Sequence, residues 1–167
     1  STLAELATGA MPGKAMAALT AARLAGIPKS TPGDVRILGC GGVARRMVGR
    51  SAAKIYHADL RAAAGEQQFG LAKDGCGALH RKLCTLANER EGVWILAADL
   101  SDAFTNIPRD GVKAAVRRKG PGLSPLADAW LPERTNHVAG GGSSKTTLVT
   151  QVRGLDPGCP MRPGFYA

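Results

Sequence analysis

Aromatic residues are scarce in this sequence, at 4% of the chain, so a hydrophobic core must be built mainly from Ala, Leu, Val and Ile side chains. The four cysteines form no C-x-x-C pair and follow no regular spacing. This pattern argues against a disulfide framework and predicts an intracellular, reducing compartment. No run of 18 apolar residues occurs, so we expect no membrane-spanning helix. A secretory signal pattern is also missing.

Acidic residues are few as well, with 13 Asp and Glu against 22 Lys and Arg, which gives a formal net charge of +9. This excess favours a polyanionic partner, with nucleic acid first and an anionic membrane or an acidic protein second. The alternative is a basic surface that only confers solubility. At 167 residues the chain is long enough for one ordinary domain or two small lobes.

An apolar run over residues 93–98 ends in a carboxylate, Asp99. Because the run is apolar on both faces and is bounded by Gly92, it predicts a buried strand. A carboxylate at the end of such a strand is either a metal ligand at the edge of a sheet or a cap for the next helix. These residues alone leave both interpretations of Asp99 open.

Residues 27–38 have the pattern of a hairpin, with a Pro-Gly-Asp turn at residues 32–34 between two short extended arms. Lys29 lies on one arm and Arg36 on the other, so the hairpin could aim two cations at one anion. The alternative is a solvated turn that carries ordinary surface charges.

Residues 43–64 have helical periodicity, with an apolar face that includes Val43, Met47 and Ile55. The other face is basic and is a candidate track for nucleic-acid phosphates, although a solvated helix face is the usual alternative. The candidate phosphate contacts on it are Arg45, Arg46, Arg50 and Lys54. Further helices are predicted over residues 14–25, 73–89, 106–119 and 126–131, with a strand over 146–153.

Two other patterns suggest ligands more weakly. Cys76, His80 and Cys84 share a face of the predicted helix 73–89, and both residue types bind zinc, but no fourth ligand is nearby. Buried thiols beside a half-buried histidine are the better interpretation. Residues 140–146 resemble a phosphate loop, yet a serine replaces the glycine before Lys145, so a hairpin tip is favoured.

Four motifs, in this order, resemble the fingers and palm of a reverse transcriptase (RNA-directed DNA polymerase) of the retroelement, non-LTR type. They are the basic hairpin, the Gln-Phe-Gly step at residues 68–70, the Asp-x-x-x-Ala-Phe stretch at residues 99–104 and the glycine-proline stretch at residues 154–163. The resemblance implies an α+β fold in which helices pack on a small antiparallel sheet. Residues 1–92 would form N-terminal helices and a fingers-like part, and residues 93–167 an incomplete palm.

The resemblance also implies a role for individual residues. Asp99 would be catalytic and would bind Mg²⁺, the cofactor if the chain is active. Lys29 and Arg36 would contact the triphosphate of a nucleotide, Phe104 would screen its sugar 2′-position, and Gly158 would lie along template and nucleotide. Carboxylate-held divalent ions suit nucleotidyl transfer, because they neutralise the triphosphate and activate the attacking hydroxyl.

The sequence departs from the family pattern in ways that bear on catalysis. The family's second metal site uses a pair of adjacent aspartates, and no Asp-Asp pair occurs in these 167 residues. Pro157 replaces the glutamine of the last motif, and Cys159 stands where an acid is common. Since one carboxylate cannot hold two Mg²⁺ ions in the required geometry, we expect that the chain does not polymerise by itself.

Two functions therefore remain as expectations. The first is a reverse-transcriptase-like fragment that binds RNA or an RNA/DNA duplex and is inactive as it stands. The second is a retroelement-derived structural subunit in a larger protein or ribonucleoprotein assembly that covers the incomplete palm. Whether the protein is an enzyme stays open at this point.

Overall fold

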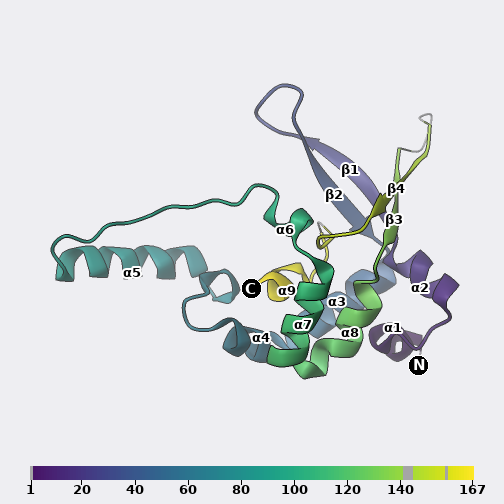
Figure 1. Cartoon of the computed structure of the whole chain (residues 1–167), viewed down its shortest axis with the longest axis horizontal. Helices are drawn as coiled ribbons and strands as arrows, with labels where there is room; N and C mark the ends of the chain where they lie inside the picture. The colour runs from purple at the N-terminus through teal and green to yellow at the C-terminus, as the bar shows by residue number, and fades with distance from the viewer. Residues whose placement is uncertain (1, 141–144, 157) are drawn as a thin grey trace.

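The fold is known from a computed structural model that describes residues 2–140, 145–156 and 158–167. It is an α+β fold, as predicted, with a small sheet and a larger helical part (Figure 1). In chain order the elements are α1 (Thr2–Thr8), α2 (Gly13–Thr20), β1 (Ala22–Pro28), β2 (Val35–Gly41), α3 (Val43–Ile55), α4 (His57–Ala64), the 3₁₀ helix η1 (Phe69–Leu71), α5 (Gly75–Glu89), α6 (Ala103–Asn106), α7 (Arg109–Lys119), the 3₁₀ helix η2 (Pro121–Leu123), α8 (Ser124–Trp130), β3 (Thr135–Ala139), β4 (Thr147–Gln151) and α9 (Arg162–Tyr166).

The four described strands form a mixed sheet in the order β2-β1-β3-β4. The prediction of an antiparallel sheet is therefore wrong for the pairing of β1 with β3. β1 and β2 form the expected hairpin, and β3 and β4 form a second antiparallel pair. β1 and β3, however, run parallel. Parallel pairing is possible because the long, largely helical connection between β2 and β3 brings the chain back to the same end of the sheet. Each pair comes from one side of the predicted boundary at residue 92, and that division stays a prediction.

The β1–β2 hairpin is longer than the sequence predicted. Its ladder extends from Pro28 opposite Val35 at the tip to Ala22 opposite Gly41 at the base. The helix expected over residues 14–25 therefore ends at Thr20, because the ladder takes the backbone groups that follow. The predicted helix over residues 43–64 is broken at Tyr56 into α3 and α4.

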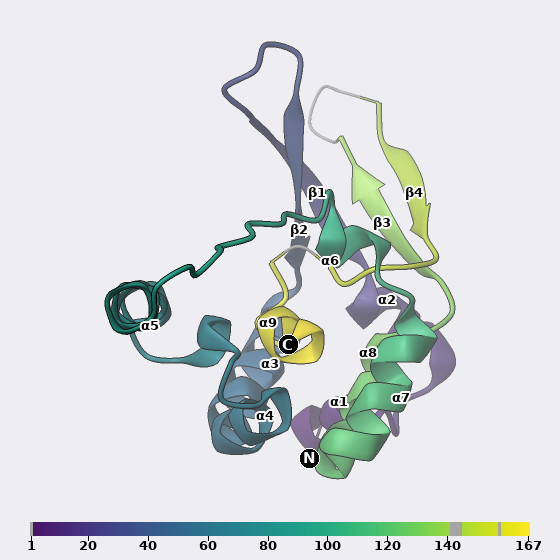
Figure 2. The same ribbon diagram turned by 60° about the vertical axis from the view of Figure 1, so that its left-hand side comes forward.

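The hydrophobic core lies between α3, α7, α8 and α9, and Figure 2 shows these helices gathered beneath the strands. Trp130 is its largest fully buried side chain, and Leu123, Leu155 and Met161 pack around it. Gly49 of α3 allows the close approach, since a Cβ there would lie 3.2 Å from the Trp130 ring. With few aromatic residues available, one tryptophan fills the centre of the core. None of the helices in the described part of the chain is long and apolar enough to cross a membrane.

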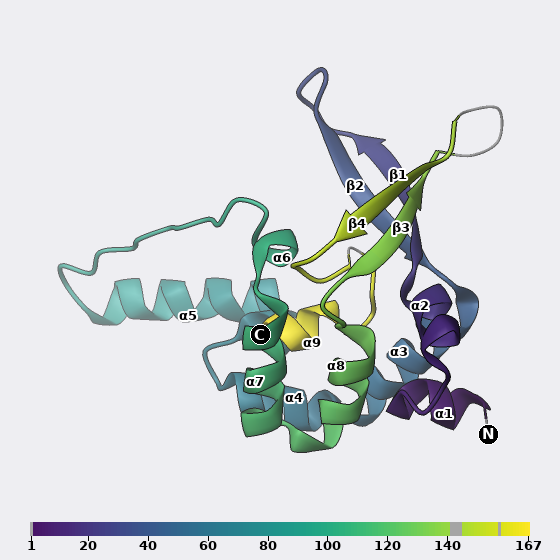
Figure 3. The same ribbon diagram turned by 45° about the vertical axis from the view of Figure 1, so that its right-hand side comes forward.

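Residues 90–102, hereafter the exposed segment, contradict the predicted buried strand. They adopt no helix or strand and run from the end of α5 back past that helix to α6 (Figure 1 and Figure 3). Trp94 is 96% exposed and Leu96 is 93% exposed. An apolar run becomes a strand only when a neighbouring strand pairs with its backbone groups, and no described strand does so here.

Candidate functional site

The β1–β2 hairpin extends away from the helices and carries both predicted triphosphate contacts on its surface (Figure 1). Lys29 closes the turn, because its N–H donates to the Asp34 carbonyl at 2.9 Å and its Nζ lies 3.9 Å from the Asp34 carboxylate. Arg36 pairs with Ile27 across the ladder. The hairpin itself is confirmed, whereas the nucleotide contacts stay a prediction.

Three of the four predicted phosphate contacts lie on the solvent side of α3. Arg46, Arg50 and Lys54 are spaced four residues apart, so they form one exposed stripe on the helix. The predicted apolar face, which also included Ala52, Tyr56 and Leu60, is wrong at Val43, Met47 and Ile55, which are 64%, 54% and 72% exposed. Its other three members do pack against the core. The face that packs on the core is instead the one that carries Val48, Gly49 and Ala52.

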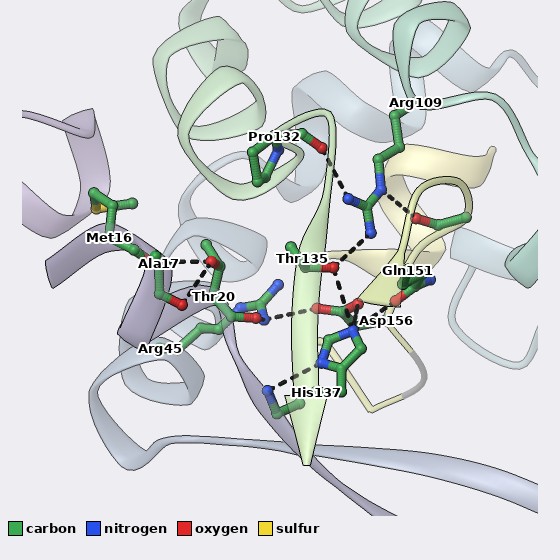
Figure 4. Close-up of polar contacts among 12 residues, drawn as sticks. Met16, Ala17, Thr20, Arg45, Arg109, Pro132, Thr135, His137, Gln151 and Asp156 are labelled. Atoms are coloured by element: carbon green, nitrogen blue, oxygen red, sulfur yellow. Dashed lines mark hydrogen bonds and ion pairs between the residues drawn. The ribbon is translucent and has the colours of Figure 1, made fainter. Parts of the chain in front are cut away.

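Arg45, the fourth predicted phosphate contact, points into the protein and is only 4% exposed. Its Nη1 donates to the Thr20 carbonyl at 2.7 Å and lies 2.7 Å from Oδ2 of Asp156 (Figure 4). Its guanidinium also stacks 5.3 Å from the centre of the Trp130 ring. Since its charge is neutralised inside the fold, Arg45 is not placed to contact phosphate.

Arg45 belongs to a buried cluster that includes Arg109, His137 and Asp156, each at most 5% exposed. His137 accepts a hydrogen bond at Nδ1 from the Ala22 N–H at 3.0 Å, so its proton is on Nε2. That nitrogen lies 2.7 Å from Oε1 of Gln151 and 3.3 Å from Oδ1 of Asp156 (Figure 4). His137 therefore links β1, β3 and the residues after β4.

Arg109 supplies the second guanidinium of the buried cluster and binds three separate segments. Its Nε donates to the Gly154 carbonyl at 3.0 Å, Nη1 to the Pro132 carbonyl at 2.8 Å and Nη2 to Oγ1 of Thr135 at 2.9 Å. These bonds attach the first turn of α7 to the start of β3 and to the loop after β4 (Figure 4).

The buried cluster shifts the pKa values of its acid and its imidazole in opposite directions. Burial alone would raise the pKa of Asp156, but contact with His137 and attraction to Arg45 outweigh it and hold that pKa below its usual value. The Asp156 carboxylate in turn raises the pKa of His137 despite burial. The cluster thus contains a stable carboxylate that balances part of the buried positive charge.

Sequence reasoning missed the buried cluster, although helical spacing carried a signal for it. Arg45 lies on the same face of its helix as Val48 and Ala52, and Arg109 shares a face with Val112 and Val116. A cation within an apolar helix face is either buried with a partner or extends to the surface. The partner, Asp156, lies in a loop, where no periodicity marks it as buried.

The structure brings together the Asp-x-x-x-Ala-Phe stretch and the glycine-proline stretch of the predicted family. The Leu155 N–H donates to the Phe104 carbonyl, and the Gly154 N–H donates to the Ile107 carbonyl, both at 2.8 Å. The Phe104 ring lies between Tyr166, with ring centroids 4.4 Å apart, and the Arg162 guanidinium at 3.8 Å. The predicted role of Phe104 as a sugar screen stays untested.

Two glycines permit this arrangement. Gly154 has a φ of +81°, and a Cβ on it would lie 2.2 Å from the Thr105 carbonyl oxygen. Gly158, a predicted nucleotide contact, has a φ of +96°, and a Cβ on it would lie 2.7 Å from the carbonyl oxygen of Gly39 in β2. Gly158 is therefore beside the base of the hairpin, and Pro157 before it lies outside the described residues.

Asp99, the predicted catalytic residue and Mg²⁺ ligand, lies in the exposed segment, and its side chain faces solvent. No group of three His, Cys, Asp or Glu side chains is placed to hold a metal ion within the described residues. The alternative as a helix cap is not supported either, since the N-cap positions of α6 and α7 are Asp102 and Pro108 and neither helix has a side-chain cap. The described residues thus do not complete a metal site here, and we derive no step through Mg²⁺.

The structure describes one of the two weaker ligand patterns, the cysteine-histidine set on α5, but only part of the other, the candidate phosphate loop. Cys76, His80 and Cys84 are all exposed, so the prediction of buried thiols is wrong; Sγ of Cys84 lies 3.6 Å from Nε2 of His80. They do not form a metal-binding group in the described structure. The candidate phosphate loop cannot be assessed, because residues 141–144 lie outside the described residues.

Comparison of the chain with protein-family models, with curated proteins and with solved structures found no match.

Proposed function

We propose that this chain is a nucleic-acid-binding module that resembles the fingers and part of the palm of a reverse transcriptase. One observation carries the proposal: Arg46, Arg50 and Lys54 form an exposed cationic stripe on α3, and none has an ion-pair partner among the described residues. The stripe extends for about 12 Å along the helix, since eight residues separate its ends. The expected ligand is the sugar-phosphate backbone of RNA or an RNA/DNA duplex.

The buried cluster explains why the stripe faces outward. A helix can present only one face to solvent, and Arg45 fixes which face that is by its bonds to Thr20 and Asp156. The stripe begins near the base of the β1–β2 hairpin, because β2 ends at Gly41 and α3 begins at Val43. Arg36, also exposed, lies farther out on the same hairpin, opposite Ile27 near its tip.

Binding of a fluorescent single-stranded RNA, measured by anisotropy over a range of salt concentrations, tests the proposal. The triple variant R46Q/R50Q/K54Q should bind more weakly and lower the slope of log K against log salt by about 2. The control K73Q/R90Q/R134Q removes the same charge from other exposed sites. Equal losses in both triples would show that net charge, and not the stripe, drives binding.

The proposal assigns no polymerase activity to this chain, because within the described residues Asp99 does not belong to a group of three His, Cys, Asp or Glu side chains that could hold a metal ion. Primer extension with Mg²⁺ and deoxynucleotides, with Asp99→Ala as the control, tests this point. We expect no extension above background for either protein. Extension that is lost in Asp99→Ala would overturn the assignment.

A structural subunit of a larger assembly is the second candidate, and the exposed segment favours it. An uncharged apolar run that is extended and unpaired attracts another chain. Analytical ultracentrifugation of the purified protein tests this candidate, with the double variant W94S/L96S as the comparison. Self-association that the double variant removes would support it. A wild-type protein that is monomeric at tens of micromolar would count against it.

A further inference from the structure

A cavity of about 560 Å³ lies between α4, the end of α7, η2 and α9. None of the residues of the cationic stripe lines it. Its floor reaches core residues, because Val116, Leu123 and Phe165 line it and are each at most 8% exposed. Leu60 and several alanines complete the apolar walls. The volume falls in the range of small-molecule sites, which are mostly apolar with a few polar groups.

Two glycines line this cavity at points where neighbouring side chains leave no room for a Cβ. A Cβ on Gly164 would lie 2.7 Å from Cδ1 of Leu60, and a Cβ on Gly122 would lie 3.3 Å from the Tyr56 ring. All four of these residues line the cavity. The Leu60 and Tyr56 side chains therefore pack directly against the backbone of these glycines, and larger side chains at the glycines would displace them.

Two cations are among the four polar side chains that line the cavity, and none of the four has a partner within the described residues. Arg118 and Lys119 have no ion-pair partner, and the Tyr56 hydroxyl has no hydrogen-bond partner, among the described residues. Neighbouring cations on the same helix are engaged: Arg117 lies 2.6 Å from Asp128, and Lys113 lies 2.8 Å from Asp110. Asp59 is the one acid among the lining residues and also lacks a partner in the described structure.

We infer that the cavity binds an amphipathic anion, whose apolar body fills the floor while Arg118, Lys119 and the Tyr56 hydroxyl hold its carboxylate or phosphate head. Two cations against one acid favour a negative head over a neutral or positive one. The apolar floor favours a hydrocarbon or aromatic body over a fully hydrated anion such as a free nucleotide phosphate. This site uses no residue of the cationic stripe, so it stands whether or not the chain binds RNA.

Isothermal titration calorimetry with four ligands of equal tail length tests the inference: decanoate, decyl phosphate, decanol and decylammonium. The two anions should bind with a stoichiometry of one, and whichever binds more tightly identifies the head group. Decylammonium should bind at least about tenfold more weakly. Equal affinities for all four ligands, or signals that do not saturate, would overturn the inference.

Variants separate the head-group contacts from the apolar floor. R118Q/K119Q should weaken both anions about tenfold and leave decanol unchanged, whereas D59N should tighten anion binding. Ala63→Phe places a large side chain at a lining position on α4 and should weaken every ligand. R90Q/R134Q removes the same charge from exposed sites outside the cavity and should leave the binding of all four ligands unchanged. An equal loss in R90Q/R134Q and R118Q/K119Q would refute a specific site, and circular dichroism confirms that each variant is folded.

Discussion

The chain has two tryptophans, and the structure places them in opposite environments. Trp130 on α8 is 2% exposed and contacts α3, whereas Trp94 in the exposed segment is 96% exposed. Both follow or precede apolar residues, so the immediate sequence does not separate them. The two differ in the elements available to pack against them. Residues of α8 pack in the core with other helices, whereas no described strand pairs with the exposed segment.

The same contrast holds for the regions around the two tryptophans. α7 and α8 bury side chains on their inner faces and connect through Arg109 to the sheet. α5, in contrast, has no fully buried residue. Because folding free energy comes largely from buried apolar area, the first region should carry most of the stability and the second very little. Each prediction below tests one side of this comparison.

Trp130→Ala should have the largest effect, because it removes the largest buried side chain in the core. We expect a loss of about 4 kcal/mol in the free energy of unfolding, combining lost transfer free energy with the cavity left behind. Urea denaturation followed by far-ultraviolet circular dichroism measures it. A loss below about 1 kcal/mol would mean that the helical core is not packed as described.

Asp156→Asn should cost about 3 kcal/mol, because it leaves the guanidinium groups of Arg45 and Arg109 buried without a countercharge. The matched control is Asp128→Asn, which removes the partner of Arg117 at the surface and should cost less than about 1 kcal/mol. Urea denaturation of both variants gives the comparison. Similar losses in the two variants would contradict the buried position of Asp156.

Gly154→Ala should cost about 2 kcal/mol, because the new Cβ would collide with the Thr105 carbonyl in a left-handed backbone conformation. Gly33→Ala provides the control, since Gly33 has a similar φ of +88° but nothing within 4 Å of its Cβ position. The control isolates the backbone strain, which we expect to cost about 1 kcal/mol. If Gly33→Ala cost as much, close approach to Thr105 would not matter.

Stability should also depend on pH through the buried cluster. Because the folded pKa of Asp156 is lowered, this group contributes stability above about pH 4 that is lost as the pH falls through its folded pKa. His137 has a raised folded pKa, so its contribution is fully present below about pH 6.5 and is lost as the pH rises through its higher folded pKa. Thermal melts should therefore show a melting temperature that falls as the pH decreases below about 4 and as it increases above about 6.5.

The acid-side loss should be smaller than that of Asp156→Asn, because a lowered pKa leaves the carboxylate only partly protonated at accessible pH. Asp156→Asn should remove the acid-side change, and His137→Gln should remove the change above pH 6.5. An acid-side change in the wild type that matches that of Asp156→Asn would show that Asp156 does not titrate with folding, and a match with His137→Gln above pH 6.5 would show the same for His137.

The fold was predictable where local pattern decides structure. The Pro-Gly-Asp turn identified the hairpin, and periodicity predicted a helix over residues 106–119, of which α7 forms Arg109–Lys119. It was not predictable where distant partners decide. Parallel pairing of β1 with β3 brings Ala22 into a hydrogen bond with His137, 115 residues away. The apolar run at residues 93–98 has the composition of a buried strand, but no neighbour in the described sheet pairs with it, so that prediction is wrong.

The candidate site was likewise predictable where local spacing decides which residues share a face, and not where distant segments meet. Helical spacing identified Arg46, Arg50 and Lys54 as one basic stripe, because positions four apart share a face whatever the rest of the chain does. Spacing could not reveal that their neighbour Arg45 is neutralised by Asp156, a contact made only after α3, β3 and the loop after β4 assemble. Composition likewise indicated a basic protein but not the cavity beside Arg118 and Lys119, whose walls come from four separate elements.

Trp94→Ser should have the smallest effect on stability, within about 0.5 kcal/mol of wild type by urea denaturation. A side chain that is 96% exposed in the folded state gains almost nothing by folding, so its removal changes both states equally. In the Trp130→Phe background, acrylamide should quench the fluorescence of Trp94 as efficiently as it quenches free tryptophan. Poor quenching, or a loss above about 2 kcal/mol, would mean that the segment is covered in solution and that the contrast between the two tryptophans fails.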